Sequence, residues 1–156
     1  MPWTKPYHPS RNQRLPAGYY ADAEHVFFIT IRGYEGQQPF LRETLNRMVL
    51  RELREAQGTF GCLVYTFCLM PDHLHFLVRP EIDGRSVLAF TDRFKGKTTN
   101  LSWSCGWTGH LWQPRYYDHM IRSDESLRAI ASYILDNPVR KRLVASAEEW
   151  PWSGEG

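Results

Sequence analysis

The sequence predicts an α+β domain in which helices cover an antiparallel sheet. Runs of β-branched and aromatic residues alternate with segments whose apolar residues recur at helical spacing. Two of the apolar runs are separated only by Pro71-Asp72, as in a hairpin. The 156 residues are 42% hydrophobic, which is enough for one core. We therefore expect one domain over residues 21–156, with a short tail from about residue 138, behind a basic N-terminal arm of residues 1–20.

The first half of the chain predicts a strand, a helix and a hairpin. Residues 25–32 (HVFFITIR) are β-branched and aromatic, which favours a strand. Residues 40–57 carry apolar side chains near helical spacing, and Gly58 is expected to end that helix. Residues 59–70 are almost wholly apolar, which is typical of a strand buried on both faces. Residues 73–79 alternate like its hairpin partner.

The second half predicts a helix, a strand and a final helix. Residues 86–99 combine apolar and basic side chains in a helical pattern. Residues 111–121 (LWQPRYYDHMI) predict a fourth strand, and Pro114 favours an edge position for it. Residues 123–137 predict the last helix, with Ser123 as its N-cap. The order βαββαβ is that of a ferredoxin-like antiparallel sheet, with one C-terminal helix added.

Composition argues against several classes of protein. The net charge of +2 neither requires nor excludes a nucleic-acid partner. No apolar stretch is long enough to cross a bilayer, so we expect no membrane partner and a cytoplasmic location. The three cysteines contain no CxxC pair, which argues against a disulfide scaffold or a four-cysteine zinc site. No GxxxxGK[ST] stretch occurs, so no nucleotide cofactor is expected.

Two histidines directly follow the predicted hairpin turn. Side chains alternate along a strand, so His73 and His75 share one face while Leu74 and Phe76 point to the other. Two imidazoles in this arrangement can chelate a divalent cation. The same pattern also fits two polar strand residues that bind nothing.

The last predicted helix carries a tyrosine and an asparagine at a spacing of four. Its buried stripe is expected to consist of apolar residues at helical spacing, namely Leu127, Ile130, Ala131 and Ile134. Tyr133 and Asn137 then share a face at the border between core and solvent, where a reactive group is both held and accessible. The alternative is a packing tyrosine and an ordinary helix end before Pro138.

Four segments of the chain resemble a known family when they are taken together. The strings MPDHLHFLV, LWQPRYYDHMIR, YILDNPVRKRLV and WPWS resemble the REP-associated tyrosine transposases, which are single-tyrosine HUH transposases of the IS200-like type. The resemblance runs from about His25 to Trp152. It implies metal-dependent cleavage and rejoining of single-stranded DNA, on hairpins of repetitive extragenic palindromes (REP), in the bacterial cytoplasm at the nucleoid.

The resemblance also assigns roles to individual residues. It makes Tyr133 the nucleophile, on what becomes the added catalytic helix, and it makes His73, His75 and Asn137 the metal ligands. None of these three ligands is charged, so a bound cation would stay dipositive beside the scissile phosphate. Oxygen ligands suit Mg²⁺ or Mn²⁺, and imidazoles lean toward Mn²⁺. Attack by tyrosine would give a 5′-phosphotyrosine and conserve the ester bond for rejoining.

Basic and aromatic residues supply candidates for DNA contacts, because cations track phosphates and aromatic rings stack on unpaired bases. The LWQPRYYD stretch resembles a segment that helps to hold DNA. Arg115 is the strongest single candidate for a phosphate contact. The full set of candidates is Arg11, Arg14, Arg93, Lys95, Lys97, Trp112, Arg115, Arg140 and Lys141.

Two other functions stay open on the sequence alone. One is a small metal hydrolase that uses His73, His75 and a third histidine such as His119, with Tyr133 merely structural. The other is a non-catalytic module that binds single-stranded nucleic acid on its sheet. The sequence also leaves open whether the protein acts as a monomer or a homodimer.

Overall fold

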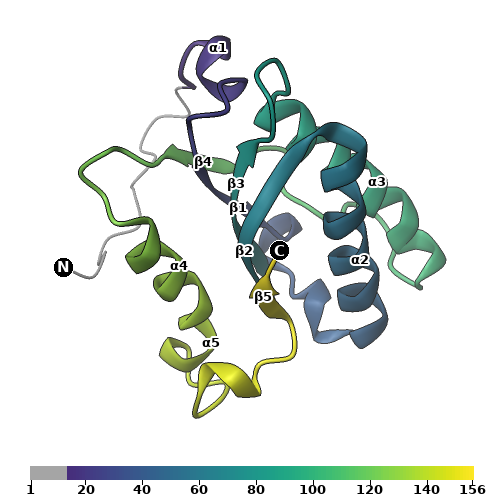
Figure 1. Ribbon diagram of the computed structural model, residues 1–156. Coiled ribbons are helices and arrows are strands. Elements are labelled where there is room, and N and C mark those ends of the chain that lie inside the picture. The colour runs from purple at the N-terminus through teal and green to yellow at the C-terminus, as the bar shows by residue number, and fades with distance from the viewer. Residues whose placement is uncertain (1–13) are drawn as a thin grey trace.

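A five-stranded antiparallel sheet forms the centre of the computed structural model, which describes residues 14–156 (Figure 1). The strand order is β4-β1-β3-β2-β5, and every neighbouring pair is antiparallel. The first four strands and the helices between them confirm the predicted ferredoxin-like order. The bounds are β1 Phe27–Arg32, β2 Cys62–Met70, β3 His73–Pro80, β4 Tyr117–Met120 and β5 Ser153–Glu155.

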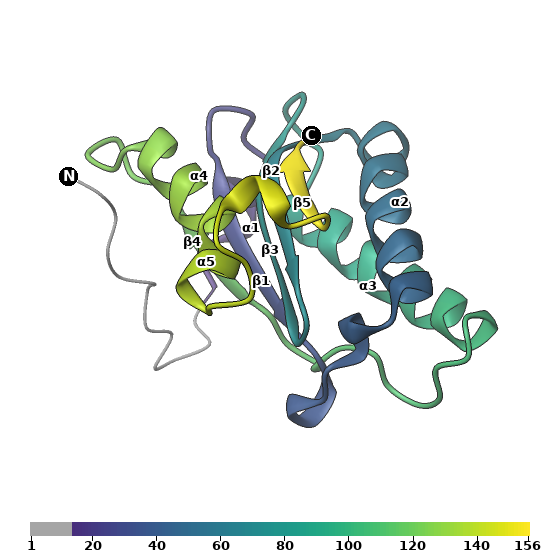
Figure 2. The ribbon, with the colours of Figure 1, turned by 90° about the horizontal axis from the view of Figure 1, so that it is seen from below.

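Helices cover both faces of this sheet. Figure 2 shows α2 and α3 on one side and α4 with α5 on the other. Shorter helical segments lie before β1 and in the connections. The bounds are α1 Ala17–Tyr20, α2 Glu43–Phe60, α3 Val87–Ser104, α4 Leu127–Leu135 and α5 Asn137–Arg140, with 3-10 turns at Tyr34–Gly36, Pro39–Leu41 and Ala147–Glu149. Within residues 14–156, no helix is both long enough and apolar enough to span a bilayer.

Helices α2 and α3 extend further at their C-terminal ends than the sequence predicts. Gly58 lies inside α2, and the helix ends instead at Gly61, whose φ of 66° is the left-handed conformation that favours glycine. The Gly61 N–H donates to the Gln57 carbonyl over 3.0 Å. The Ser86 side chain caps α3 as a serine should, but the helix continues to Ser104.

The fourth strand and the last helix are both shorter than predicted. Residues 111–116 are irregular apart from one bridge between Trp112 and Gly33, so only residues 117–120 form a strand. The last helix starts at Leu127, with Ser126 rather than Ser123 as its cap. It stops at Leu135, and a separate short helix begins at Asn137.

The C-terminal tail adds the strand that the sequence does not predict. Residues 153–155 pair with β2 at the edge of the sheet as β5. The Leu69 backbone also bonds to both tryptophans of the tail, donating to the Trp152 carbonyl over 2.8 Å and accepting from Trp150 Nε1 over 3.0 Å. This segment therefore packs along β2.

Strand alternation divides the interior into two cores. Leu74 and Phe76 point toward α2 and α3 and pack in the larger core. The smaller core lies under α4 and contains Phe28, Cys68, Met70, Leu77, Ile130 and Ile134. His73 and His75 lie on this second side, as the alternation predicts. Leu127 is 37% exposed, so its predicted place in the buried stripe of the last helix is wrong.

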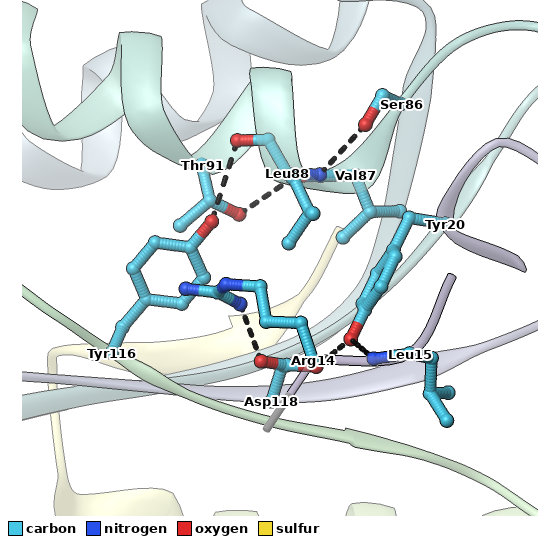
Figure 3. A network of polar contacts seen from close by, with 9 residues as sticks. All are labelled: Arg14, Leu15, Tyr20, Ser86, Val87, Leu88, Thr91, Tyr116 and Asp118. Carbon is cyan, nitrogen blue, oxygen red and sulfur yellow. Dashed lines mark hydrogen bonds and ion pairs between the residues drawn. The ribbon is translucent and has the colours of Figure 1, made fainter. Parts of the chain in front are cut away.

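Residues 14–20 pack against β4 through a network of polar contacts (Figure 3). The Asp118 carboxylate pairs with Arg14 and accepts a hydrogen bond of 2.6 Å from the Tyr20 hydroxyl. The Tyr20 hydroxyl in turn accepts from the Leu15 N–H over 3.0 Å. Burial, together with the bond to Asp118, raises the pKa of Tyr20 to about 12. The described part of the predicted arm is thus partly helical and docked.

The packing of α4 against the second core can be tested through the stability of the protein. Ile134 is fully buried between α4 and the sheet. Ile134→Ala should therefore lower the free energy of unfolding by about 2–4 kcal/mol, since it leaves a cavity, while Ile134→Val should cost only about 1 kcal/mol. Urea denaturation of the two variants measures both losses. Equal losses would show that this side chain does not anchor α4.

Candidate active site

A cavity of about 370 Å³ opens where the β2–β3 turn faces α4 and α5. The four residues that the resemblance assigns to the reaction, His73, His75, Tyr133 and Asn137, all line it. Its remaining walls include two basic side chains, Arg32 and Lys141, as well as Gln38, Met70, Pro71, Asp72 and Leu143. The structure thus brings together His73 and Asn137, which lie 64 positions apart in the chain.

The two imidazoles face each other inside this cavity. His73 Nε2 lies 3.0 Å from His75 Nε2, and the ring planes are inclined by 72°. The outer nitrogen of each ring has its own partner. His73 Nδ1 donates to the Asp72 carboxylate over 2.6 Å, and His75 Nδ1 bonds to Thr30 Oγ1 over 2.8 Å. These partners fix the rings with both Nε2 atoms turned inward.

The electrostatics favour a neutral His75. Its pKa lies well below the usual range because the ring is desolvated and because His73, Arg32, Arg140 and Lys141 bring positive charge close to it. The pKa of Asp72 is lowered chiefly by the hydrogen bond that it accepts from His73. A neutral imidazole oriented by a hydrogen bond at its far nitrogen is the form that binds metals.

Asn137 approaches the same point from the other side of the cavity. Its side chain is 3% exposed, and Nδ2 lies 3.1 Å from His73 Nε2. The sequence predicts Asn137 and Tyr133 on one continuous helix, and this prediction is wrong. Asp136 ends α4 as its C-cap and precedes α5 as its N-cap, so Asn137 is the first residue of α5.

Tyr133 lies on the last turn of α4 and is held by Arg140 from α5. The guanidinium carbon of Arg140 is 3.7 Å from the centre of the Tyr133 ring. Arg140 Nη1 also donates to the Tyr133 carbonyl over 2.7 Å, a group near the end of α4. Arg140, predicted as a DNA contact, therefore links the two helices and orients the tyrosine.

The donors around His73 fit a divalent cation. Two imidazole nitrogens and the side-chain amide of Asn137 converge on one point. Rotating the amide would present its oxygen, which Mg²⁺ and Mn²⁺ accept. His119 is engaged elsewhere, because its Nε2 lies 2.9 and 3.1 Å from the Glu125 carboxylate oxygens. Within residues 14–156, no three His, Cys, Asp or Glu side chains group as metal ligands.

Several residues predicted to contact DNA have partners within the protein. Trp112 is buried, and its Nε1 donates to Thr98 Oγ1 over 2.8 Å. Lys97 forms an ion pair of 2.9 Å with Glu52. Arg93, also on α3, lies over the Phe60 ring, so both cations belong to the helical layer on the other side of the sheet from the histidines.

The remaining candidates differ in their surroundings. Arg115 is exposed within the irregular segment 111–116, and Lys141 is exposed at the rim of the histidine cavity. Lys95 donates to the carbonyls of Gln113 and Pro114 over 2.7 and 3.1 Å. Arg14 is paired with Asp118, and Arg11 lies outside the described residues.

Sequence reasoning missed three residues of the cavity region. Asp72 and Thr30 orient the histidines, and Arg32 adds a positive charge. Asp72 could have been found from its place next to His73. Thr30 and Arg32 reach the site only because β1 pairs with β3, where they oppose His75 and His73.

Comparisons with known proteins agree on one family. The family model described as "Transposase IS200 like" matches residues 25–137. A Haemophilus influenzae protein named "Putative REP-associated tyrosine transposase" is 28% identical over 143 residues, which cover 82% of this chain and 78% of that protein. The "REP-associated tyrosine transposase" of Escherichia coli is 30% identical over 91 residues, 58% of this chain and 52% of that one.

A solved structure has a similar fold. The structure of a REP-associated tyrosine transposase bound to a REP hairpin superposes with a TM-score of 0.76 at 23% identity. The match covers 92% of this chain and 81% of the other. At this level of identity the likeness supports the fold alone.

Lys95 makes the free energy of unfolding depend on pH. Burial lowers its pKa to about 8, from an ordinary value of ~10.4. Between those values the unfolded chain binds more protons than the folded one, so the contribution of Lys95 to stability rises with pH. Wild-type protein should therefore gain stability relative to Lys95→Met between about pH 8 and pH 10. Urea denaturation at each pH measures the difference, and a constant difference would contradict the lowered pKa.

Proposed function

The chain belongs to the IS200-like transposase family, and we propose that it cuts and rejoins single-stranded DNA with Tyr133 as the nucleophile. Family membership makes it a DNA-processing enzyme. The observation that supports the finer proposal is the cavity in which Tyr133 meets His73, His75 and Asn137. A nucleophile and a set of metal-binding groups in one cavity are what transesterification of a phosphodiester requires.

The proposed reaction exchanges one phosphate ester for another. The Tyr133 oxygen forms a bond to phosphorus while the bond from phosphorus to the 3′ oxygen breaks. The phenol proton passes to water, and the departing 3′ oxygen gains a proton. The product is a 5′-phosphotyrosine and a free 3′ hydroxyl, so attack by a 3′ hydroxyl reverses the step without a nucleotide cofactor.

The chain supplies the positioning for this step. Arg140 holds the Tyr133 ring from α5, and Arg32 and Lys141 bring positive charge to the cavity that the phosphate would enter. We propose that His73 Nε2, His75 Nε2 and Asn137 hold Mg²⁺ or Mn²⁺. Bound there, the ion would polarise the scissile phosphate. Asp72 and Thr30 would keep the imidazoles oriented toward it.

The proposed substrate is hairpin DNA with a single-stranded arm. A similarly folded transposase is bound to a REP hairpin, which supports a REP-like palindrome as the substrate here too. Three exposed cations, Arg32, Arg115 and Lys141, lie on or near the cavity. We propose that the protein encounters this DNA at the bacterial nucleoid.

The nucleophile can be identified directly. Wild-type protein incubated with a REP hairpin oligonucleotide and Mn²⁺ should form a covalent adduct on the peptide that contains Tyr133. Tyr133→Phe should form none, because its ring lacks the attacking oxygen. Proteolysis and mass spectrometry locate the adduct.

The neighbouring tyrosines provide the controls for this experiment. Tyr117 opposes Thr30 in the sheet and so shares the histidine face, whereas the Tyr116 hydroxyl donates to the Leu88 carbonyl near α3. An adduct on Tyr117 would keep the reaction class and overturn the choice of Tyr133. DNA hydrolysis without any adduct would favour a metal hydrolase.

Metal binding can be tested apart from cleavage. In a Tyr133→Phe background, His73→Ala and His75→Ala should each abolish Mn²⁺ binding measured by calorimetry. Asn137→Ala should weaken it less, since water can replace one ligand. Asp72→Asn should weaken it by about 10–100-fold, because Asp72 orients His73. His119→Ala is the matched control, and a loss of binding equal to that of His73→Ala would contradict the proposed ligand set.

A further inference from the structure

A second cavity, of about 400 Å³, adjoins the candidate active site. One wall is formed by residues 113–116 of the irregular segment and by Tyr117 at the start of β4, and the other is formed by Thr30 and Arg32 of β1. Arg32 lines both cavities. Thr30 lines the second and is hydrogen-bonded to His75 of the first. The two cavities are therefore neighbours along β1.

Arg32 is available to bind an anion at this boundary. It is exposed at the end of β1, directly opposite His73. Among residues 14–156, the ion pairs do not include Arg32, whereas Arg14, Arg47 and Arg122 each pair with a carboxylate.

The far wall of the second cavity is held in place by the fold. The Gln113 N–H donates to the Arg32 carbonyl over 2.8 Å, and Lys95 donates to the Gln113 and Pro114 carbonyls. Two cations contact the Tyr116 ring, with the Arg14 guanidinium at 4.4 Å and Lys95 Nζ at 5.1 Å from its centre. This wall is therefore formed before any ligand arrives, which reduces the ordering cost of binding.

The chemistry of the walls points to one class of ligand. Pro114 and Tyr117 offer apolar surface, and Arg115 adds an exposed guanidinium, which can stack on or hydrogen-bond to a base. Arg32 supplies a partner for a phosphate. An aromatic base joined to a phosphate satisfies both features, whereas an inorganic anion would use only Arg32.

We propose that this second cavity binds the nucleotide next to the scissile phosphodiester, with its base against residues 113–117 and its phosphate on Arg32. The inference rests on the proposed function, because it takes the substrate to be single-stranded DNA that passes the histidines. It adds a specificity site: the identity of one base beside the cut is read by the segment that contains Arg115.

Abasic substitutions test the proposal without any cleavage. The protein is Tyr133→Phe in EDTA, and the probe is a fluorescent REP hairpin whose single-stranded arm carries one abasic site at a time, read by anisotropy. One abasic position should weaken binding about tenfold, since it removes a stacked base. Adding Arg115→Ala should remove most of that penalty, because the two changes then delete the same interaction.

Arg32 is tested by the salt dependence of binding to the intact probe. Arg32→Ala should lower the slope of log affinity against log salt by about one, the loss of one phosphate contact. Arg54→Ala is the matched control, because it removes an exposed arginine from α2, on the other face of the sheet. Circular dichroism confirms that each variant folds.

Each outcome bears on the proposal in a definite way. An abasic penalty that persists unchanged in Arg115→Ala, or equal salt slopes for Arg32→Ala and Arg54→Ala, would overturn it. Absence of hairpin binding would do the same. Failure of the proposed function is distinguishable, since it appears as the absence of a covalent adduct in wild-type protein while position-dependent binding is retained.

Discussion

The alternation of side chains along β3 is the constraint on which the site depends. It sends Leu74 and Phe76 into the core under α2 and α3, and it sends His73 and His75 to the opposite face. Because β3 pairs with β1 on one side and β2 on the other, a shift of one residue would bury both imidazoles in an apolar core. The packing that stabilises the sheet therefore also fixes the register of the histidine pair.

The break between α4 and α5 is the second determinant of the site. Pro138 has no N–H to donate to the preceding turn, which favours a new helix start at this point. As a result Asn137 turns toward His73 while Tyr133 stays on α4, and Arg140 reconnects the two helices by bonding to the Tyr133 carbonyl. The nucleophile and the amide thus come from different elements, each held by its own contacts.

Local patterns predicted most of the fold, and the errors arose where tertiary contacts decide. Periodicity indicated β1 to β4 and the long helices, because the apolar residues of their buried faces recur at strand or helix spacing. β5 contains only Ser, Gly and Glu and forms through pairing with β2. Its own residues therefore show no pattern of apolar or β-branched side chains that would predict a strand. The motif strings predicted four site residues, and the structure brings all four to one cavity. Thr30 and Arg32 reach the site by sheet pairing, and the ion pair of Lys97 and the burial of Trp112 depend on packing.

The distribution of charge connects the fold to its proposed substrate. The net charge is only +2, too small to attract DNA to the whole surface. On α2 and α3, some cations are neutralised by a carboxylate: Glu52 pairs with Lys97, and Glu43 pairs with Arg47. Around the two cavities, Arg32, Arg115 and Lys141 form no ion pair with any carboxylate of residues 14–156. The positive charge of these three side chains is therefore not cancelled by a paired carboxylate at the place where a phosphate backbone would have to lie.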